Sequence, residues 1–191
     1  MRKNFLGAIA FVFAFSGASL PPSPVADAAM KGDLAVVRAL IARGANVNVP
    51  QGDGMTALHW AAERADSAIA VALLRAKANV RAKTRVGDYT PLHIAAKTGS
   101  APVVRALLNA GSNPNALTTS GATPLHFAAA SGDPGAVQAL LDRKVDVNAR
   151  EKEWGQTPLV FAAAFGRAEA IRVLMKGGAD ASIHTSAVNL T

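Results

Sequence analysis

The chain has 191 residues, of which half are apolar and only 5% aromatic, and its 20 basic and 13 acidic residues give a formal net charge of +7. Its length allows one domain or at most two, and its apolar content excludes a disordered or collagen-like chain. The absence of cysteine excludes a disulfide scaffold, a cysteine zinc site, a thiol nucleophile and a lipid-modified N-terminal cysteine.

Residues 1–18 have the pattern of a secretory signal peptide. Arg2 and Lys3 precede an apolar run over residues 5–15, and small residues follow it up to Ala18. We expect cleavage after Ala18, which would place the protein in the periplasm or outside the cell. The run is short for a membrane span, which needs about 20 apolar residues. Two alternatives stay open: a weaker cleavage site ending at Ala28, and retention of the segment as an anchor.

From residue 19 onward the sequence repeats itself. A Ser or Thr, followed in most copies by Pro, recurs at spacings of 33, 34, 33 and 34 residues, at Ser23, Thr56, Thr90, Thr123 and Thr157. A pair of large apolar residues recurs at the same spacings, beginning at Leu40, Leu73, Leu107, Leu140 and Leu174. Two independent series with one period predict a repeat architecture.

Each unit is predicted to fold as a helix, a tight turn, a second helix and an extended β-turn. A Ser or Thr side chain caps the first helix, and a proline at the first helical position loses no hydrogen bond there. Paired alanines, such as Ala95 and Ala96, let neighbouring helices approach closely. Glycine ends most of the helices, but Ala65, Lys77 and Lys144 stand at three of these turn positions. We expect both lysines to adopt the left-handed backbone that glycine adopts freely.

Two segments carry a resemblance to a known family: residues 90–96 read TPLHIAA and residues 123–129 read TPLHFAA. They resemble the ankyrin-repeat signature, and the resemblance extends over about residues 22–183. It implies an all-α solenoid of five helix-turn-helix repeats, whose β-turn fingers and first helices line a concave groove. The implied repeats are about 22–54, 55–88, 89–121, 122–155 and 156–183, followed by a tail over residues 184–191.

Three repeats depart from this pattern. The first lacks the histidine, and the fifth has Val160 in its place, which is typical of terminal repeats that face solvent on one side. The second has Ala57 in place of proline and Ala65 in place of the turn glycine. We therefore expect the second repeat to have the least well-determined helix start.

The sequence offers no catalytic constellation and no metal site. His59, His93 and His126 share one repeat position, and the resemblance implies that each hydrogen-bonds backbone in the adjoining turn rather than a metal. His184 stands alone in the tail, with no acid or histidine at ligand spacing. The chain contains no phosphate-binding loop, nucleophile elbow or zinc-protease motif. We therefore expect no enzyme and no cofactor.

One run of basic residues stands out. It crosses from the second helix of repeat two into the following finger without an intervening acid, and consists of Arg75, Lys77, Arg81, Lys83 and Arg85. It is interpreted either as a solvated edge that keeps the solenoid soluble or as a surface for an acidic protein or other anionic partner. Only Tyr89 lies near the run as a stacking ring, so nucleic acid is not an expected partner.

The family's variable finger and first-helix positions give the candidate partner-binding residues, and the same mapping includes Val86. The finger over residues 150–154 alternates in charge and ends in a Trp that either recognises a partner or packs on the neighbouring finger. Phe165 indicates an apolar groove floor or packing against whatever follows repeat five. The candidates are Asp53, Met55, Glu63, Arg64, Arg85, Tyr89, Lys97, Thr98, Ser131, Trp154 and Phe165.

These observations predict an exported, non-enzymatic module that binds a partner protein, with no stable membrane insertion once the signal peptide is removed. We expect a monomer with an acidic partner. Two alternatives remain: the chain is the recognition segment of a longer exported enzyme or receptor, or it is an inhibitor or immunity-type protein that blocks one secreted enzyme.

Overall fold

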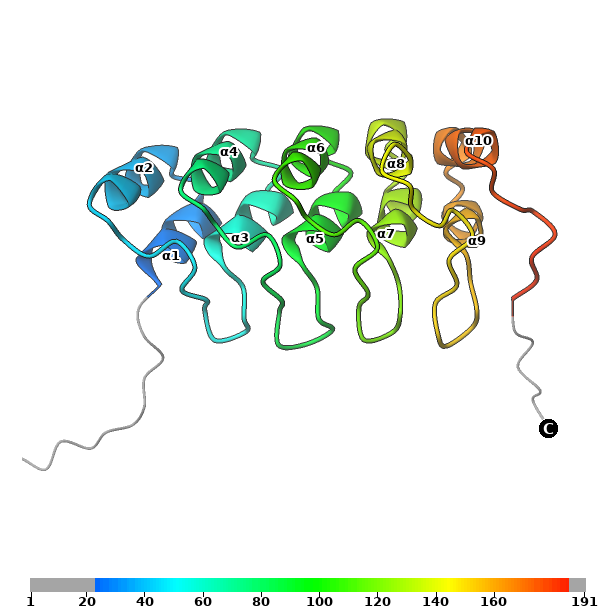
Figure 1. The fold of residues 1–191 in the computed structure, drawn as a ribbon, viewed down its shortest axis with the longest axis horizontal. Coiled ribbons are helices and arrows are strands. Elements are labelled where there is room, and N and C mark those ends of the chain that lie inside the picture. The colour runs from blue at the N-terminus through cyan, green and yellow to red at the C-terminus, as the bar shows by residue number, and fades with distance from the viewer. Residues whose placement is uncertain (1–22, 186–191) are drawn as a thin grey trace, which may run out of the picture.

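The computed structural model describes residues 23–185, which form one row of stacked helix pairs (Figure 1). The predicted signal peptide and the last six residues of the predicted tail lie outside this range. The ten helices of the described residues are α1 Pro24–Lys31, α2 Leu34–Ala42, α3 Ala57–Glu63, α4 Ser67–Arg75, α5 Pro91–Lys97, α6 Ala101–Asn109, α7 Pro124–Ser131, α8 Pro134–Leu141, α9 Pro158–Ala164 and α10 Ala168–Lys176. The predicted all-α solenoid of helix pairs is confirmed, while the repeat boundaries stay predictions.

The core runs the length of the stack because every helix pair buries the same positions against its neighbours. The paired alanines of α3, α5 and α7 have no exposed surface, so adjacent first helices pack closely, as predicted. One leucine of each of these helices fills the space beside them, at Leu58, Leu92 and Leu125. Second helices add Leu73, Leu107, Leu140 and Leu174. No helix among residues 23–185 is long and apolar enough to cross a membrane.

The turn positions follow the predicted register. Lys77 and Lys144 have φ angles of 62° and 53°, as Gly44, Gly111 and Gly178 have positive φ after the other second helices. Ala65 has a φ of 54° at the position that glycine takes between the helices of the other pairs. Non-glycine residues rarely adopt this backbone, so the register of the turns is established by three exceptions rather than by the glycines alone.

The expected weak start of the second repeat is wrong. Thr56, before α3, has φ −95° and ψ 170°, and its backbone N–H donates to Nδ1 of His59 at 3.1 Å, as in the repeats that have proline. The irregular start is that of α1, where Ser23 has ψ 63° and makes no capping hydrogen bond. The reason is that the threonine and histidine make the cap, and repeat two keeps both, whereas proline only fixes φ.

Four fingers project from the helices on the same side of the stack (Figure 1). Each is closed at its base by a backbone hydrogen bond, from Gln51 to Met55, Thr84 to Tyr89, Thr118 to Ala122 and Glu151 to Gln156. The second and fourth fingers are one residue longer, which accounts for the alternation of 33- and 34-residue spacings. Neighbouring fingers are joined by the N–H of Arg85 to Asp53 O, of Thr119 to Gly87 O and of Lys152 to Ser120 O, at 2.8–3.1 Å.

Candidate functional site

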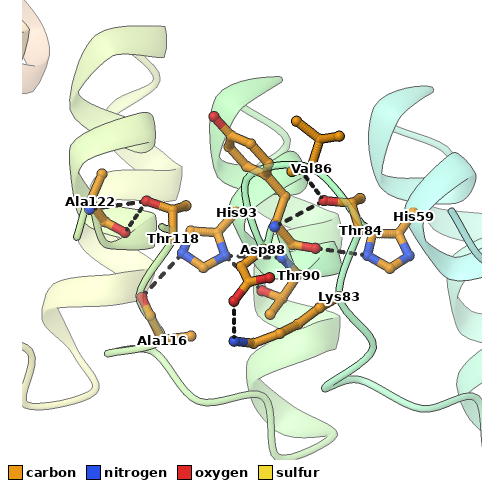
Figure 2. A network of polar contacts seen from close by, with 11 residues as sticks. His59, Lys83, Thr84, Val86, Asp88, Thr90, His93, Ala116, Thr118 and Ala122 are labelled. Carbon is orange, nitrogen blue, oxygen red and sulfur yellow. Dashed lines mark hydrogen bonds and ion pairs between the residues drawn. The ribbon is translucent and has the colours of Figure 1, made fainter. Parts of the chain in front are cut away.

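The three repeated histidines tie each first helix to the next finger or to the loop that leads into it, and Figure 2 shows two of them, His59 and His93. Nδ1 of His93 accepts the N–H of Thr90 at 3.1 Å, so the ring proton is assigned to Nε2, which donates to the carbonyl of Ala116 at 3.1 Å. His59 and His126 repeat the arrangement with the carbonyls of Tyr89 and Gln156. All three rings are fully buried. Both ring nitrogens of each histidine form hydrogen bonds with backbone groups, as the resemblance implies.

Burial holds these histidines in the neutral form. It lowers the pKa of His59 and of His93 to about 4, and it lowers that of His126 as well, although the hydrogen bond from each ring to a carbonyl acts in the opposite direction. A protonated ring would also lose the bond that Nδ1 accepts. Among residues 23–185, no three His, Asp or Glu side chains are grouped so that they could hold a metal ion.

The groove holds a pocket of about 240 Å³ between the second and third repeats. Its lining combines an apolar patch with acidic groups and one lysine, and consists of Asp53, Met55, Glu63, Thr84, Val86, Tyr89, Ile94 and Lys97. Five of the predicted candidates meet here. Thr84 and Ile94 were not predicted, because a threonine at a finger base and an apolar residue inside a helix read as structural positions.

The pocket has one side formed by a tightly packed aromatic ring, Tyr89, and another formed by a highly exposed fingertip residue, Val86. The ring of Tyr89 meets those of His93 and Phe127 edge-on, with centroids 6.2 and 5.5 Å apart, so it is held in place from behind. Val86 is 83% exposed at the fingertip opposite. A β-branched apolar side chain in that position has no role in the core. The pocket can therefore receive an apolar side chain of a partner.

Four candidates use polar groups within the fold. The carboxylate of Asp53 accepts the backbone N–H of Met55 at 2.8 Å, inside its own finger. Arg64 donates to the carbonyl of Met30 at 3.4 Å, which joins α3 to α1. Thr98 donates to the carbonyls of Ala62 and Ala95 at 3.1 Å, and Ser131 donates to that of Ala128 at 2.8 Å. The hydroxyl groups of Thr98 and Ser131 are thereby engaged in the fold, whereas the exposed guanidinium of Arg64 keeps further N–H groups accessible to a partner.

The remaining candidates lie on exposed surface outside the pocket lining. Arg85 is exposed next to Val86, and its backbone N–H is bonded to the preceding finger. Trp154 is 44% exposed on the last finger, and Phe165 is 59% exposed at the end of α9. The pocket therefore gathers the candidates of repeats two and three but none of those of repeats four and five.

Glu151 has a structural role that the charge pattern of its finger concealed. Its buried carboxylate accepts the backbone N–H groups of Glu153, Trp154 and Gln156 at 2.7–2.9 Å. Burial alone would raise the pKa of this carboxyl group, but the three N–H groups outweigh burial and the pKa is lowered. A signal was present in the sequence: Thr84 and Thr118 occupy the same repeat position and also accept backbone N–H groups of their fingers.

The basic run is less uniform than its sequence suggests. Lys83 forms an ion pair with Asp88 at 2.9 Å across the finger (Figure 2). The finger bends back at Gly87 and Asp88, both with positive φ, and so brings an acid that follows the run in sequence beside it in space. The unpaired cations of the run are therefore Arg75, Lys77, Arg81 and Arg85, among the residues that the structure describes.

Comparison with protein families shows to which family the chain belongs. The family model described as ankyrin repeats (3 copies) matches residues 25–118 and again residues 110–185. These matches cover most of the chain, which therefore belongs to the ankyrin-repeat family. Ankyrin repeats are generally protein–protein interaction modules. No curated protein matches the chain.

Proposed function

We propose that this chain is an exported, non-enzymatic module that binds one partner protein through the groove pocket between repeats two and three. The observation that carries the proposal is the pocket itself, where Val86 is exposed at the fingertip and Tyr89 is braced beneath it. Apolar anchors in a pocket with a polar rim are the usual source of binding energy at protein interfaces.

The same proposal covers export, stoichiometry and charge. The basic start and short apolar run of residues 1–18 support export, and a chain that starts at Ser19 would carry a net charge of +5. The protein acts as a monomer, and its partner carries acidic residues that meet the free cations of the basic run. N-terminal sequencing of the mature protein tests export: a start near Ser19 supports it, and Met1 on a cytoplasmic protein contradicts it.

Binding is tested by comparing three baits in a pull-down from periplasmic extract, followed by measurement of affinity for the captured protein. Val86→Asp places a charge in the pocket, whereas Val36→Asp places one on α2, where the valine is 44% exposed far from the fingers. We expect the wild type and Val36→Asp to bind the captured protein alike and Val86→Asp to lose it. Equal binding by all three would contradict the use of the pocket.

The stoichiometry of that complex separates the possible roles. Tight 1:1 binding of one secreted enzyme, with loss of its activity, would identify an inhibitor. Weak binding of several proteins would instead identify a scaffold or the recognition segment of a longer protein.

A further inference from the structure

A second concave region lies outside the groove, along the loops that lead from the second helices to the fingers. Two hollows of about 480 and 450 Å³ adjoin there between repeats two and three. The first is lined by Leu74, Lys77, Ala78, Asn79, Val80, Arg81 and Ala110. The second is lined by Val80, Arg81, Lys83, Thr90, Asn113 and Ala116. Because they share Val80 and Arg81, the two hollows form one surface, which we call the basic loop edge.

Lys77 occupies a backbone conformation that costs stability. Its φ is 62°, and the equivalent positions after α2, α6 and α10 are glycines with φ between 78° and 91°. A side chain held in the left-handed region is strained, and such strain collects at functional sites. At Lys77 it sets a cation at the mouth of the first hollow.

Arg81 replaces a residue that joins neighbouring loops. The equivalent residues in the loops before the first and the last finger are Asn48 and Asn148, whose side-chain oxygens accept the N–H of Asn79 at 2.7 Å and of Asp180 at 2.9 Å. Arginine has no acceptor and cannot make this bond to the N–H of Asn113. The second hollow lies where that bond would be.

The basic loop edge thus lacks two stabilising features of other repeats, the turn glycine and the loop-joining asparagine. Lys77 and Arg81 stand in their places. Neither Lys77 nor Arg81 forms an ion pair within residues 23–185. Lys144 has the same strained backbone in repeat four, but Asp142 and Asp146 flank it in sequence. Of the two strained lysines, only Lys77 therefore lies in a hollow whose lining contains no acid.

We propose that the basic loop edge binds an acidic peptide segment of the partner, with Lys77 and Arg81 as its main contacts. This inference rests on the proposed function in that the partner is a protein with acidic residues, and it adds that they belong to one peptide segment held mainly by Lys77 and Arg81. A peptide fits the surface because the hollows have short apolar floors for side chains beside the cations. No aromatic ring lines them for a base to stack on, and no large apolar side chain of the lining is exposed enough to enter a bilayer.

Fluorescence anisotropy with a labelled octapeptide of alternating Glu and Ser tests the proposal on the full chain, with a Gln-for-Glu peptide as the control probe. The variants are Lys77→Gly and Arg81→Asn, each of which restores the residue that equivalent repeats carry, so neither should unfold the protein. We expect the double variant to weaken binding at least about tenfold. Lys144→Gly is the matched control and should leave the Kd unchanged.

Three results would overturn the proposal. The first is that the wild type and the double variant bind the octapeptide equally well, and the second is that the wild type binds the Glu and Gln peptides equally well. The third is that the wild type binds a single-stranded oligonucleotide or anionic lipid vesicles more tightly than the acidic peptide. Val86→Ser separates this surface from the groove, because it should keep the octapeptide while weakening the captured partner protein. Loss of the partner by Val86→Ser with no effect of the double variant on the octapeptide would leave the groove proposal standing and reject the loop edge.

Discussion

In the third repeat every residue from Pro91 to Ala96 of α5 is buried, whereas only Pro158 and Ala162 of α9 are buried in the fifth repeat. The two helices differ in their neighbours. α5 packs between α3 and α7, while α9 contacts α7 and α10. They also differ at one side chain, since His93 hydrogen-bonds the carbonyl of Ala116 in the loop before the next finger, and Val160 has no polar group to do so. A repeat is therefore held as much by what lies on both sides of it as by its own sequence.

The largest expected effect is a loss of stability in acid, which comes from the repeats with a buried histidine and not from the fifth, which has Val160 there. Between pH 6.5 and about 4 the unfolded chain binds a proton at His59 and His93 that the folded chain excludes, so stability falls as the pH falls. The loss is on the order of 3 kcal/mol for each histidine. About 2 kcal/mol of it for each histidine falls between about pH 7 and about pH 5, and urea denaturation at these two pH values measures that part. Equal unfolding free energies at the two values would contradict the buried, neutral histidines.

Removing one histidine should have a comparable effect. His93→Ala leaves the carbonyl of Ala116 and the N–H of Thr90 without their partner and opens a cavity, which should cost about 3 kcal/mol. Val160→Ala, at the same position of the fifth repeat, should cost about 1 kcal/mol or less. Denaturant melts of both variants measure the difference. Stoichiometric zinc or iron in the purified protein, lost in His93→Ala, would instead make the histidine a ligand.

A smaller effect is expected at the turns that end the second helices. Gly111→Lys should destabilise by about 1 kcal/mol, because φ there is 86° and no atom crowds the added side chain, so backbone strain acts alone. Lys77→Gly and Lys144→Gly should be neutral or gain a few tenths of a kcal/mol, since the relief of strain is offset by a more flexible unfolded chain. A loss of more than about 1 kcal/mol in both glycine variants would show that these lysines lie inside helices.

The smallest effect is expected at Ser112, whose buried hydroxyl has no hydrogen-bond partner within the described residues. The equivalent positions include Ala45, Ala78 and Ala179. Ser112→Ala should stabilise the protein by about 0.5 kcal/mol, because it removes an unsatisfied polar group from the interior. Thermal melts of this variant beside Ser100→Ala provide the comparison. A clear drop in melting temperature for Ser112→Ala would mean that its hydroxyl is bonded after all.

These repeats show why the sequence predicted the fold in more detail than the surface. Periodicity placed the helices and even the strained backbone of Lys77 and Lys144, because each repeat supplies an independent test of the register. It did not predict the ion pair of Lys83 with Asp88, which depends on how one longer finger bends. It also misread Glu151, because a charge is assigned to the surface unless its hydrogen-bond partners are known.

The gathering of candidates into one pocket could not be predicted either. Repeats two to five all offer finger and first-helix positions, and the sequence gives no reason to prefer one pair. The preference arises from side-chain size: Tyr89 and Val86 border a hollow in the third repeat, whereas Ala122 and Ser120 stand near the equivalent positions in the fourth. The depth of the groove at any point therefore depends on the side chains of two neighbouring repeats, not on those of one repeat.

The bonds that join the fingers have a mechanical consequence. Each links one finger only to the finger before it, from Arg85 to Asp53, from Thr119 to Gly87 and from Lys152 to Ser120. A stretching force on the two ends of the stack acts on each interface, where the finger bonds and the packed helices resist it together. We expect repeat five, with the fewest buried residues in its first helix, to yield before the middle. The chain would then unfold one repeat at a time, and each unfolded repeat could refold against the repeat that is still folded.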